Sequence, residues 1–348
     1  MDVSGLKKLH LVGPHAAAVI DHVTRRNVGK ITSGRCAYAT ILNDAGKLVD
    51  DCVIYRMAPN AWMVVHGSGS GHELPAAECV GRNVAMLFDD DPHDLSLQRP
   101  LAVDFLAGQV PGIRGLGYFR HMPTTLFGGS VTISRTGYTG ERGYEIFCRV
   151  ADAPMIWDTI LAEGASSGII PTAFTALDLL RVESYLLFYP YDNSEMFPFD
   201  AAPPGDTLWE LGLDFTGSPG KTGFRGAAAH YAAKGRERFC IFGILLDGTM
   251  AADAGAMVST GGAKVGVVTC GMVSSQTGKS MALAGLSVEA ATQGTRLEVA
   301  GAGRALPIVC RSTIRRRRSG RQRGERQGWA NSSRKDAQRR PVSRPPSM

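Results

Sequence analysis

The chain has 348 residues, of which 44% are hydrophobic and 42 are glycine, a composition typical of a folded, turn-rich protein with room for two or three cores. Residues 311–348 hold 13 of the 38 Lys and Arg but only 2 of the 32 Asp and Glu, so residues 1–310 carry a net charge of −5, which makes nucleic-acid binding by the body of the protein unexpected. The sequence has neither an apolar run long enough for a membrane span nor a signal-peptide pattern, so a cytoplasmic protein without membrane contact is expected.

An α/β pattern opens the chain. Short apolar runs at Leu9–Val12 and Ala37–Leu42 predict strands, and the apolar spacing of Pro14–Thr24 between them predicts a helix. Leu48–Tyr55 and Ala61–Val65 then predict a pair of strands joined by a turn.

Two adjacent acids within this strand pair, Asp50 and Asp51, are the first residues that could carry chemistry. Adjacent side chains on a strand point to opposite faces, so at most one of the two carboxylates enters any given pocket. The alternative is a structural one, because the turn-forming segment Asn43–Lys47 precedes the acids and a hairpin turn could carry them as solvated charges.

A glycine-rich loop marks the next part of the chain. Runs at Leu101–Phe105 and Val131–Ser134 predict further strands. The second run continues into the loop Arg135–Gly143, which leads into a strand at Tyr144–Phe147 and not into a helix, so a phosphate site is disfavoured. The loop is either a structural hairpin or a wall where a planar ring approaches the backbone. Glu145 beyond it would need donors such as the guanidine-like edge of a pterin ring.

Helical spacing follows at Ala153–Glu163 and Ala173–Leu186. Glu183, near the end of the second helix, lies close in sequence to Arg181, which favours a surface or interhelical role over the alternative of a ligand contact. The aromatic-rich loop Phe188–Phe199 either packs against the core or lines a ligand cleft.

Short strands separated by glycine turns predict a separate all-β module. They are Ile241–Leu246, Lys264–Cys270, Met281–Leu286, Arg296–Val299 and Leu306–Cys310. The tail at residues 311–348 has almost no aromatic or β-branched residues and is interpreted as a reading-frame error, a disordered end or a nucleic-acid arm. The seven cysteines and eight histidines form no paired or ligand-like pattern, so reduced thiols and no metal site are expected.

Four motifs occur in an order and spacing that is more specific than any one of them. They are Asp2-Val3-Ser4, Asn43-x-x-Gly46-x-x-x-Asp50-Asp51, Arg135-Thr136-Gly137-Tyr138-Thr139-Gly140-Glu141 with Glu145, and Leu180-Arg181-Val182-Glu183. Together they resemble the folate-dependent aminomethyltransferase family, which includes the T protein of the glycine cleavage system and the dimethylsulfoniopropionate demethylases. The likeness runs from residue 2 to about residue 309.

The resemblance implies an α+β protein with a three-domain, clover-leaf fold, in which two interleaved α/β domains are joined to a C-terminal β-barrel-like module. It divides the chain into a first folate-binding region at 1–115, a second at 116–228, the β module at 229–310 and the basic, disordered tail at 311–348. The family normally has a further stretch before Asp2, so the chain is expected to begin inside the first domain.

The resemblance also implies a one-carbon transferase that uses tetrahydrofolate as its cofactor. Carried over by position, Asp51 approaches the reacting folate nitrogen and Glu145 holds the pterin, while Tyr138, Asp50 and Glu183 are further cofactor-binding candidates. The small-molecule donor provides an aminomethyl or a methyl group, and a lipoyl carrier protein is the partner if glycine is cleaved. The alternative is a folate-binding protein that has an assembly or regulatory role and no catalysis.

Three departures from the family pattern concern the donor. Gly5-Leu6 follows Ser4 where the glycine-cleavage branch has His-Met, and Leu177 occupies a position at which that branch has an Arg. The segment Tyr189–Asn193 also differs, which suggests a substrate wall of another shape. The missing guanidinium speaks against straightforward glycine cleavage.

Overall fold

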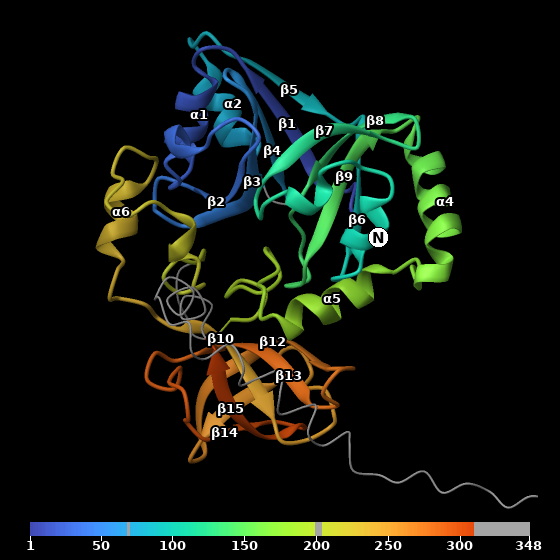
Figure 1. Ribbon diagram of the computed structural model, residues 1–348. Helices are drawn as coiled ribbons and strands as arrows, with labels where there is room; N and C mark the ends of the chain where they lie inside the picture. The colour runs from blue at the N-terminus through green and yellow to red at the C-terminus, as the bar shows by residue number, and fades with distance from the viewer. Residues whose placement is uncertain (68–69, 199–203, 310–348) are drawn as a thin grey trace, which may run out of the picture. The chain divides into compact units, whose positions relative to one another are not determined.

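A computed structural model describes residues 1–67, 70–198 and 204–309, and all its strands pair in antiparallel fashion within two sheets and a closed barrel (Figure 1). This arrangement confirms the predicted α+β class with a C-terminal β barrel. Four short 3-10 helices connect the larger elements: η1 (Val28–Lys30), η2 (Ile113–Gly115), η3 (Ala165–Ser167) and η4 (Asp214–Thr216). None of the helices in these three ranges is both long and apolar enough to cross a membrane.

The first sheet has five strands in the order β2-β3-β4-β1-β5. They are β1 (Lys7–Val12), β2 (Cys36–Leu42), β3 (Leu48–Ala58), β4 (Ala61–His66) and β5 (Ala85–Asp89). Helices α1 (Ala16–Val23) and α2 (Glu73–Cys79) cover its outer face. There Ile20 of α1 packs with Leu9, Ile54 and Trp62 in one buried cluster, so the apolar runs of the sequence form this core as predicted.

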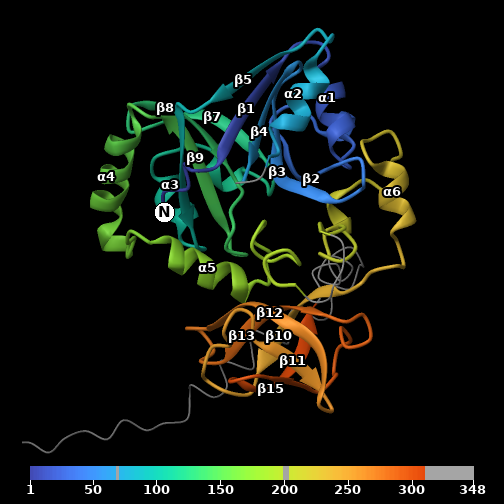
Figure 2. The same cartoon turned by 180° about the vertical axis from the view of Figure 1, so that it is seen from behind.

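The second sheet has four strands in the order β6-β9-β8-β7. They are β6 (Pro92–Gln98), β7 (His121–Leu126), β8 (Gly129–Ser134) and β9 (Gly143–Arg149). Helix α4 (Ala153–Gly164) lies on its outer face, where Ile156 packs with Ile133 and Ile146 (Figure 2). Thus the outer faces of both sheets carry helices and their inner faces look toward each other.

The predicted strand at Leu101–Phe105 is wrong, because this run lies in helix α3 (Ala102–Ala107). Its buried residues Ala102, Val103 and Leu106 fall at helical spacing on the second sheet's core. A short apolar run cannot be assigned to helix or strand by periodicity alone. Strand β6 thus lies in the second sheet and helix α3 packs on the core of that sheet, although both precede residue 115. The predicted domain boundaries stay predictions.

The chain then crosses between the sheets and the barrel. Helix α5 (Phe174–Glu183) packs on two strands of the C-terminal barrel, β12 (Ala263–Val273) and β13 (Ser280–Leu286), and α6 (Ala227–Ala232) packs near the end of the first sheet. A buried cluster that includes Leu42, Leu48, Leu208 and Phe239 joins these segments.

The barrel closes in the order β10-β13-β12-β11-β14-β15. Its strands are β10 (Cys240–Leu246), β11 (Met257–Thr260), β12 (Ala263–Val273), β13 (Ser280–Leu286), β14 (Leu297–Val299) and β15 (Gly303–Val309). Each strand predicted in this part of the sequence is present, while β11 was not predicted. Cys310, the predicted end of the last strand, and the tail at 311–348 lie outside the described residues.

Candidate active site

The acid pair on β3 separates onto the two faces of the first sheet, as the period of a strand requires. Asp50 shares its face with Cys52, which belongs to the core under α1 and α2. Asp51 points to the inner face, where Tyr55 packs against Phe147 of the second sheet. The expectation that the two acids point to opposite faces is therefore confirmed, and Asp51 is the acid on the inner face.

Asp51 is half-buried and held by a tyrosine from the neighbouring strand. The hydroxyl of Tyr38 on β2 donates to Oδ2 of Asp51 at 2.5 Å, and the Tyr38 ring stacks on Phe215 with centroids 6.3 Å apart. Tyr189 of the aromatic loop donates through its hydroxyl to the carbonyl of Leu48 on β3 at 3.3 Å, and burial and then the charge of Asp50 raise the pKa of Tyr189 to about 12. The predicted catalytic carboxylate is thus held by Tyr38, which in turn stacks on Phe215.

Asp50, by contrast, is fully buried and bonded within the protein. Its Oδ2 lies 2.8 Å from Nδ1 of His66, and its Oδ1 accepts the backbone N–H of Asp51 at 2.9 Å. Both side chains of the His66–Asp50 pair have no exposed surface. A cofactor contact for Asp50 stays a prediction, and the observed bonds favour a structural task.

Glu145 lies on β9 at the inner face of the second sheet, where Thr136 and Tyr55 both donate to its Oε2. Burial raises the pKa of Glu145 above its ordinary value. Within the described residues both of its hydrogen bonds use Oε2, so Oε1 can accept bonds from a ligand. The nearby Asp94 on β6 is fully buried, and its pKa is raised by burial and then by the charge of Glu145.

Asp51 and Glu145 are linked along one face of β3. Asp51, Val53 and Tyr55 alternate onto the inner face, and the Tyr55 hydroxyl reaches Glu145 at 3.5 Å. Four residues of a strand span roughly 13 Å, so the two carboxylates mark the ends of an elongated strip and do not form a close pair.

Tyr138 of the glycine-rich loop lies at the segment that follows α5, with its hydroxyl donating to the carbonyl of Leu187. The loop touches this segment closely: a Cβ at Gly140, which has a φ of +73°, would lie 1.9 Å from Oγ of Ser184. Ser184 in turn donates to the carbonyl of Thr139 at 3.0 Å. These contacts support the structural interpretation of the loop, and a cofactor contact for Tyr138 stays a prediction.

Glu183 faces the barrel, in agreement with the predicted interhelical or surface role. Its Oε2 accepts a bond of 3.3 Å from Gln276, and its Oε1 is buried without a hydrogen-bond partner in the described part of the chain. No described contact brings Glu183 together with Asp51 or Glu145, so its ligand role stays a prediction.

Asp192 fixes the aromatic loop through a buried ion pair on one side and a hydrogen bond on the other. Asp192 accepts a bond from the Arg181 guanidinium of α5, and both side chains are at most 3% exposed. The other oxygen of Asp192 accepts the Thr269 hydroxyl of β12 at 2.6 Å. The loop that carries Tyr189 is thereby tied to α5 and to the barrel.

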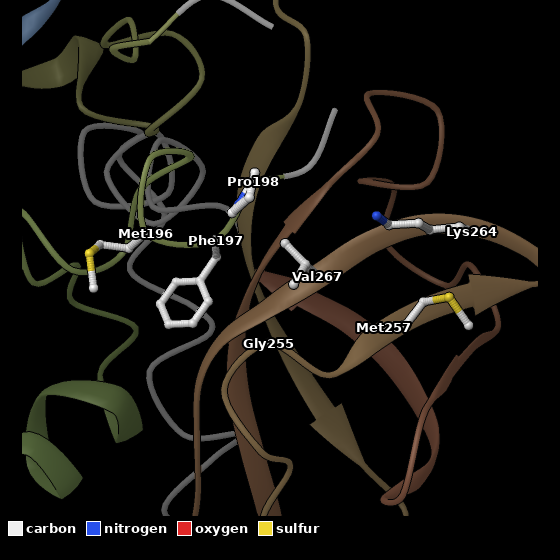
Figure 3. A pocket seen from close by; sticks show the side chains of 7 residues that line it. All are labelled: Met196, Phe197, Pro198, Gly255, Met257, Lys264 and Val267. Atoms are coloured by element: carbon white, nitrogen blue, oxygen red, sulfur yellow. The ribbon is translucent and has the colours of Figure 1, made fainter. Parts of the chain in front are cut away.

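A separate pocket of about 450 Å³ lies where this loop meets the barrel (Figure 3). Its lining residues are Met196, Phe197, Pro198, Gly255, Met257, Lys264 and Val267. None of the predicted site residues lines it, so its position supports no link to the carboxylates.

Sequence reasoning missed Tyr38, His66 and Thr136 as functional candidates. Tyr38 and His66 contact Asp51 and Asp50 from neighbouring strands, and Thr136 contacts its carboxylate, that of Glu145, around a loop. Such contacts depend on strand register.

The aromatic loop was predicted to pack against the core or to line a cleft. Tyr189 packs against the buried cluster that includes Leu42 and Leu48, in agreement with the first alternative, while Phe197 lines the separate pocket.

Comparison with known proteins gives matches along most of the chain. The family model of the GCVT N-terminal domain matches residues 1–202, and that of the glycine cleavage T-protein C-terminal barrel domain matches residues 238–314. The heme-dependent oxidative N-demethylase gamma subunit of Ectopseudomonas mendocina (strain ymp) is 62% identical over 86% of this chain and 80% of that protein.

More distant relatives differ in their names. An aminomethyltransferase of Saccharopolyspora erythraea is 32% identical over 88% of this chain and 83% of its own length. The trimethylamine-oxide aldolase of Ruegeria pomeroyi is 31% identical over 86% of this chain but only 38% of its own length. Among solved structures, glycine cleavage system aminomethyltransferase T from Bartonella henselae matches with a TM-score of 0.78 at 24% identity, over 88% of this chain and 83% of that one, which shows a shared fold.

Proposed function

This chain belongs to the glycine cleavage T-protein family, and we propose that it transfers a one-carbon unit to tetrahydrofolate, with Asp51 as the group that exchanges a proton at the reaction centre. The observation that carries the proposal is the placement of Asp51 on the inner face, with its Oδ2 held by Tyr38 at 2.5 Å. Family membership supports a folate-dependent enzyme, and the choice of donor and residue roles is our inference.

The residues of the inner face fit a folate. Pterin rings present a guanidine-like edge of donors, and Glu145 offers a buried carboxylate whose Oε1 is not engaged by any described hydrogen bond. When bound, tetrahydrofolate supplies the nitrogens that accept the carbon. Glu145 would hold the pterin, and the Tyr38 ring at Asp51, stacked on Phe215, would help to exclude water from the reacting end.

Asp51 can hold or release a proton at a fixed position. The Tyr38 hydroxyl donates to Oδ2 and stabilises the ionised carboxylate, which favours the form that accepts a proton. Tyr38 is itself immobilised, since Arg26 donates to its carbonyl at 2.5 Å and Phe215 stacks on its ring. Alignment of this kind, together with proton transfer, is what the reaction requires of the protein.

We infer that the transferred carbon is at the oxidation level of formaldehyde. The relative with 62% identity is named as a subunit of an oxidative N-demethylase, and oxidation of an N-methyl group produces an iminium or carbinolamine carbon at that level. Formaldehyde and tetrahydrofolate combine to 5,10-methylenetetrahydrofolate and water without a further oxidant. Leu177, which is 5% exposed, stands where the glycine-cleaving branch has an Arg, and this supports a donor other than an aminomethyl carrier.

The proposed partner is a heme-containing oxidative subunit, because the same relative is named as the gamma subunit of a heme-dependent enzyme. A lipoyl carrier protein is the partner in the competing case of glycine cleavage.

Turnover can be tested with tetrahydrofolate and ¹³C-formaldehyde, with 5,10-methylenetetrahydrofolate followed by NMR and the uncatalysed condensation subtracted. Asp51→Asn should lower the enzymatic rate at least about 100-fold. Asp104→Asn is the matched control, because Asp104 lies on α3 and pairs with Arg114 at the surface. Full turnover in Asp51→Asn would refute the assigned role, and folate binding without turnover in the wild type would favour a binding protein.

A further inference from the structure

Asp50 and His66 form a closed pair behind the proposed catalytic residue. Oδ2 of Asp50 and Nδ1 of His66 are 2.8 Å apart, with neither side chain exposed. Because an ionised carboxylate only accepts hydrogen bonds, Nδ1 carries the proton in this pair. The second ring nitrogen, Nε2, is buried and has no hydrogen-bond partner within the described residues.

Neighbouring residues pack closely on the pair. A Cβ at Gly71 would lie 2.8 Å from Oδ2 of Asp50 and 3.1 Å from Nδ1 of His66, so the backbone there packs directly on the pair. The ring of His72 stacks on His66, with centroids 5.9 Å apart and planes 25° apart. Any effect of the pair on the proposed site must therefore pass through the other contacts of Asp50.

The other hydrogen bond of Asp50 among the described residues goes to the backbone of Asp51. Oδ1 of Asp50 accepts the Asp51 N–H at 2.9 Å, a bond that is partly buried. A buried carboxylate with one partner only would be unstable in this orientation, and His66 supplies the second partner that locks it. A chain of two hydrogen bonds thus runs from the His66 ring to the Asp51 backbone.

We propose that Asp50 and His66 are positioning residues that fix the Asp51 backbone and thereby the direction of its carboxylate toward Tyr38. This inference rests on the proposed function of Asp51. A displacement of about 1 Å at a reacting group can cost on the order of 100-fold in rate, which is the scale of effect expected from losing this pair.

The test compares His66→Leu with His66→Asn in the full-length chain. Leucine fills the site but removes the donor, whereas the asparagine side-chain nitrogen can occupy the position of Nδ1 and bond to Asp50. We expect His66→Leu to lower kcat about 10- to 100-fold with the Kd for tetrahydrofolate unchanged within about twofold, and His66→Asn to restore most of kcat. The matched control is His10→Leu, which removes a partly exposed imidazole–carboxylate pair with Asp89 on the same sheet.

A second readout does not depend on turnover. With ¹³C-labelled aspartate, the Asp51 carboxyl can be titrated by NMR, its signal assigned through Asp51→Asn. His66→Leu should shift this titration by at least about half a pH unit, because the carboxylate changes its distance to Tyr38, and His66→Asn should reverse the shift. Should His66→Leu not fold, Asp50→Asn is the second variant, since it keeps the shape and the Oδ1 acceptor but reverses the polarity of the bond to His66.

The outcomes separate the two proposals. An altered Asp51 titration in a protein that lacks turnover with formaldehyde refutes the proposed function and leaves the positioning role standing. Wild-type turnover with an unchanged kcat and an unchanged Asp51 titration in His66→Leu overturns the positioning role and leaves the proposed function standing.

Discussion

The stability of this protein should fall between pH 7 and pH 5 because of one histidine, His230. Its ring is fully buried and stacked on Trp209 with centroids 4.8 Å apart, and neither ring nitrogen has a hydrogen-bond partner among the residues that the structure describes. Burial, and then the charge of Arg25, lowers the pKa of His230 from 6.5 to about 4. The folded state therefore holds the neutral ring.

The sign of the effect follows from this lowered pKa. Above pH 6.5 the ring is neutral in both states and the free energy of unfolding is unaffected. As the pH falls toward 4, the unfolded chain binds a proton that the folded chain does not, so stability is lost. With pKa values of 6.5 and 4, the loss between pH 7 and pH 5 is about 2 kcal/mol, a range in which most carboxylates do not yet titrate.

The assay is urea unfolding of the wild type and of His230→Phe at pH 7 and pH 5. Phenylalanine keeps the stacking on Trp209, and the backbone carbonyl of residue 230 still accepts the Trp209 indole N–H, observed at 2.8 Å. His230→Phe should lose about 2 kcal/mol less than the wild type over this range. Equal losses in the two proteins would refute the reasoning.

Three further predictions concern buried polar groups. Asp192→Ala should lower the free energy of unfolding by about 3–5 kcal/mol, because it leaves the buried Arg181 guanidinium without its Asp192 partner, and chemical denaturation measures this. Lys221→Met should cost about 2 kcal/mol in the same assay, since the Lys221 ammonium donates to the carbonyls of Thr24 and Arg26 at 2.8 Å beyond the end of α1; an unchanged midpoint would contradict this. Glu145→Gln should weaken tetrahydrofolate binding about 10-fold, as measured by calorimetry, without lowering Tm, because it removes a buried charge and keeps the shape.

Strands whose apolar side chains enter the buried cores could be predicted from the sequence more readily than a strand with polar side chains on the inner face. The barrel strands other than β11, and β1 to β4, follow from their apolar runs, whose residues enter the buried cores. Strand β6 was not predicted, because its inner-face residues Asp94 and Ser96 are polar while Leu95 packs outward. Polar side chains on an inner face look like a loop in the sequence, although here they surround the proposed site.

Individual residues of the site could be predicted from the sequence, but the contacts between them could not. Asp51 and Glu145 were identified from the family motif, and their separate strands bring them to one inner face. Tyr38 and His66 carry no local signal, since Tyr38 becomes a neighbour of Asp51 only through the pairing of β2 with β3. Side-chain partners across strands are set by register, and a one-residue slip would place each side chain on the other face.

Register also explains why two identical neighbours have different tasks. In the observed pairing, Asp51 lies opposite Thr40 and diagonal to Tyr38, while Asp50 shares its face with His66 of β4. A slip of β3 by one residue would bring Asp51 toward His66 and place Asp50 on the inner face. Which of the two aspartates enters the site therefore depends on the length of the turn before β3, because the two side chains are identical. The turn is fixed accordingly: the N–H of Gly46 donates to Asn43, and a Cβ at Gly46, with φ +70°, would lie 2.5 Å from the His230 backbone nitrogen. The close packing of this turn against α6 is therefore part of what places Asp51 in the site.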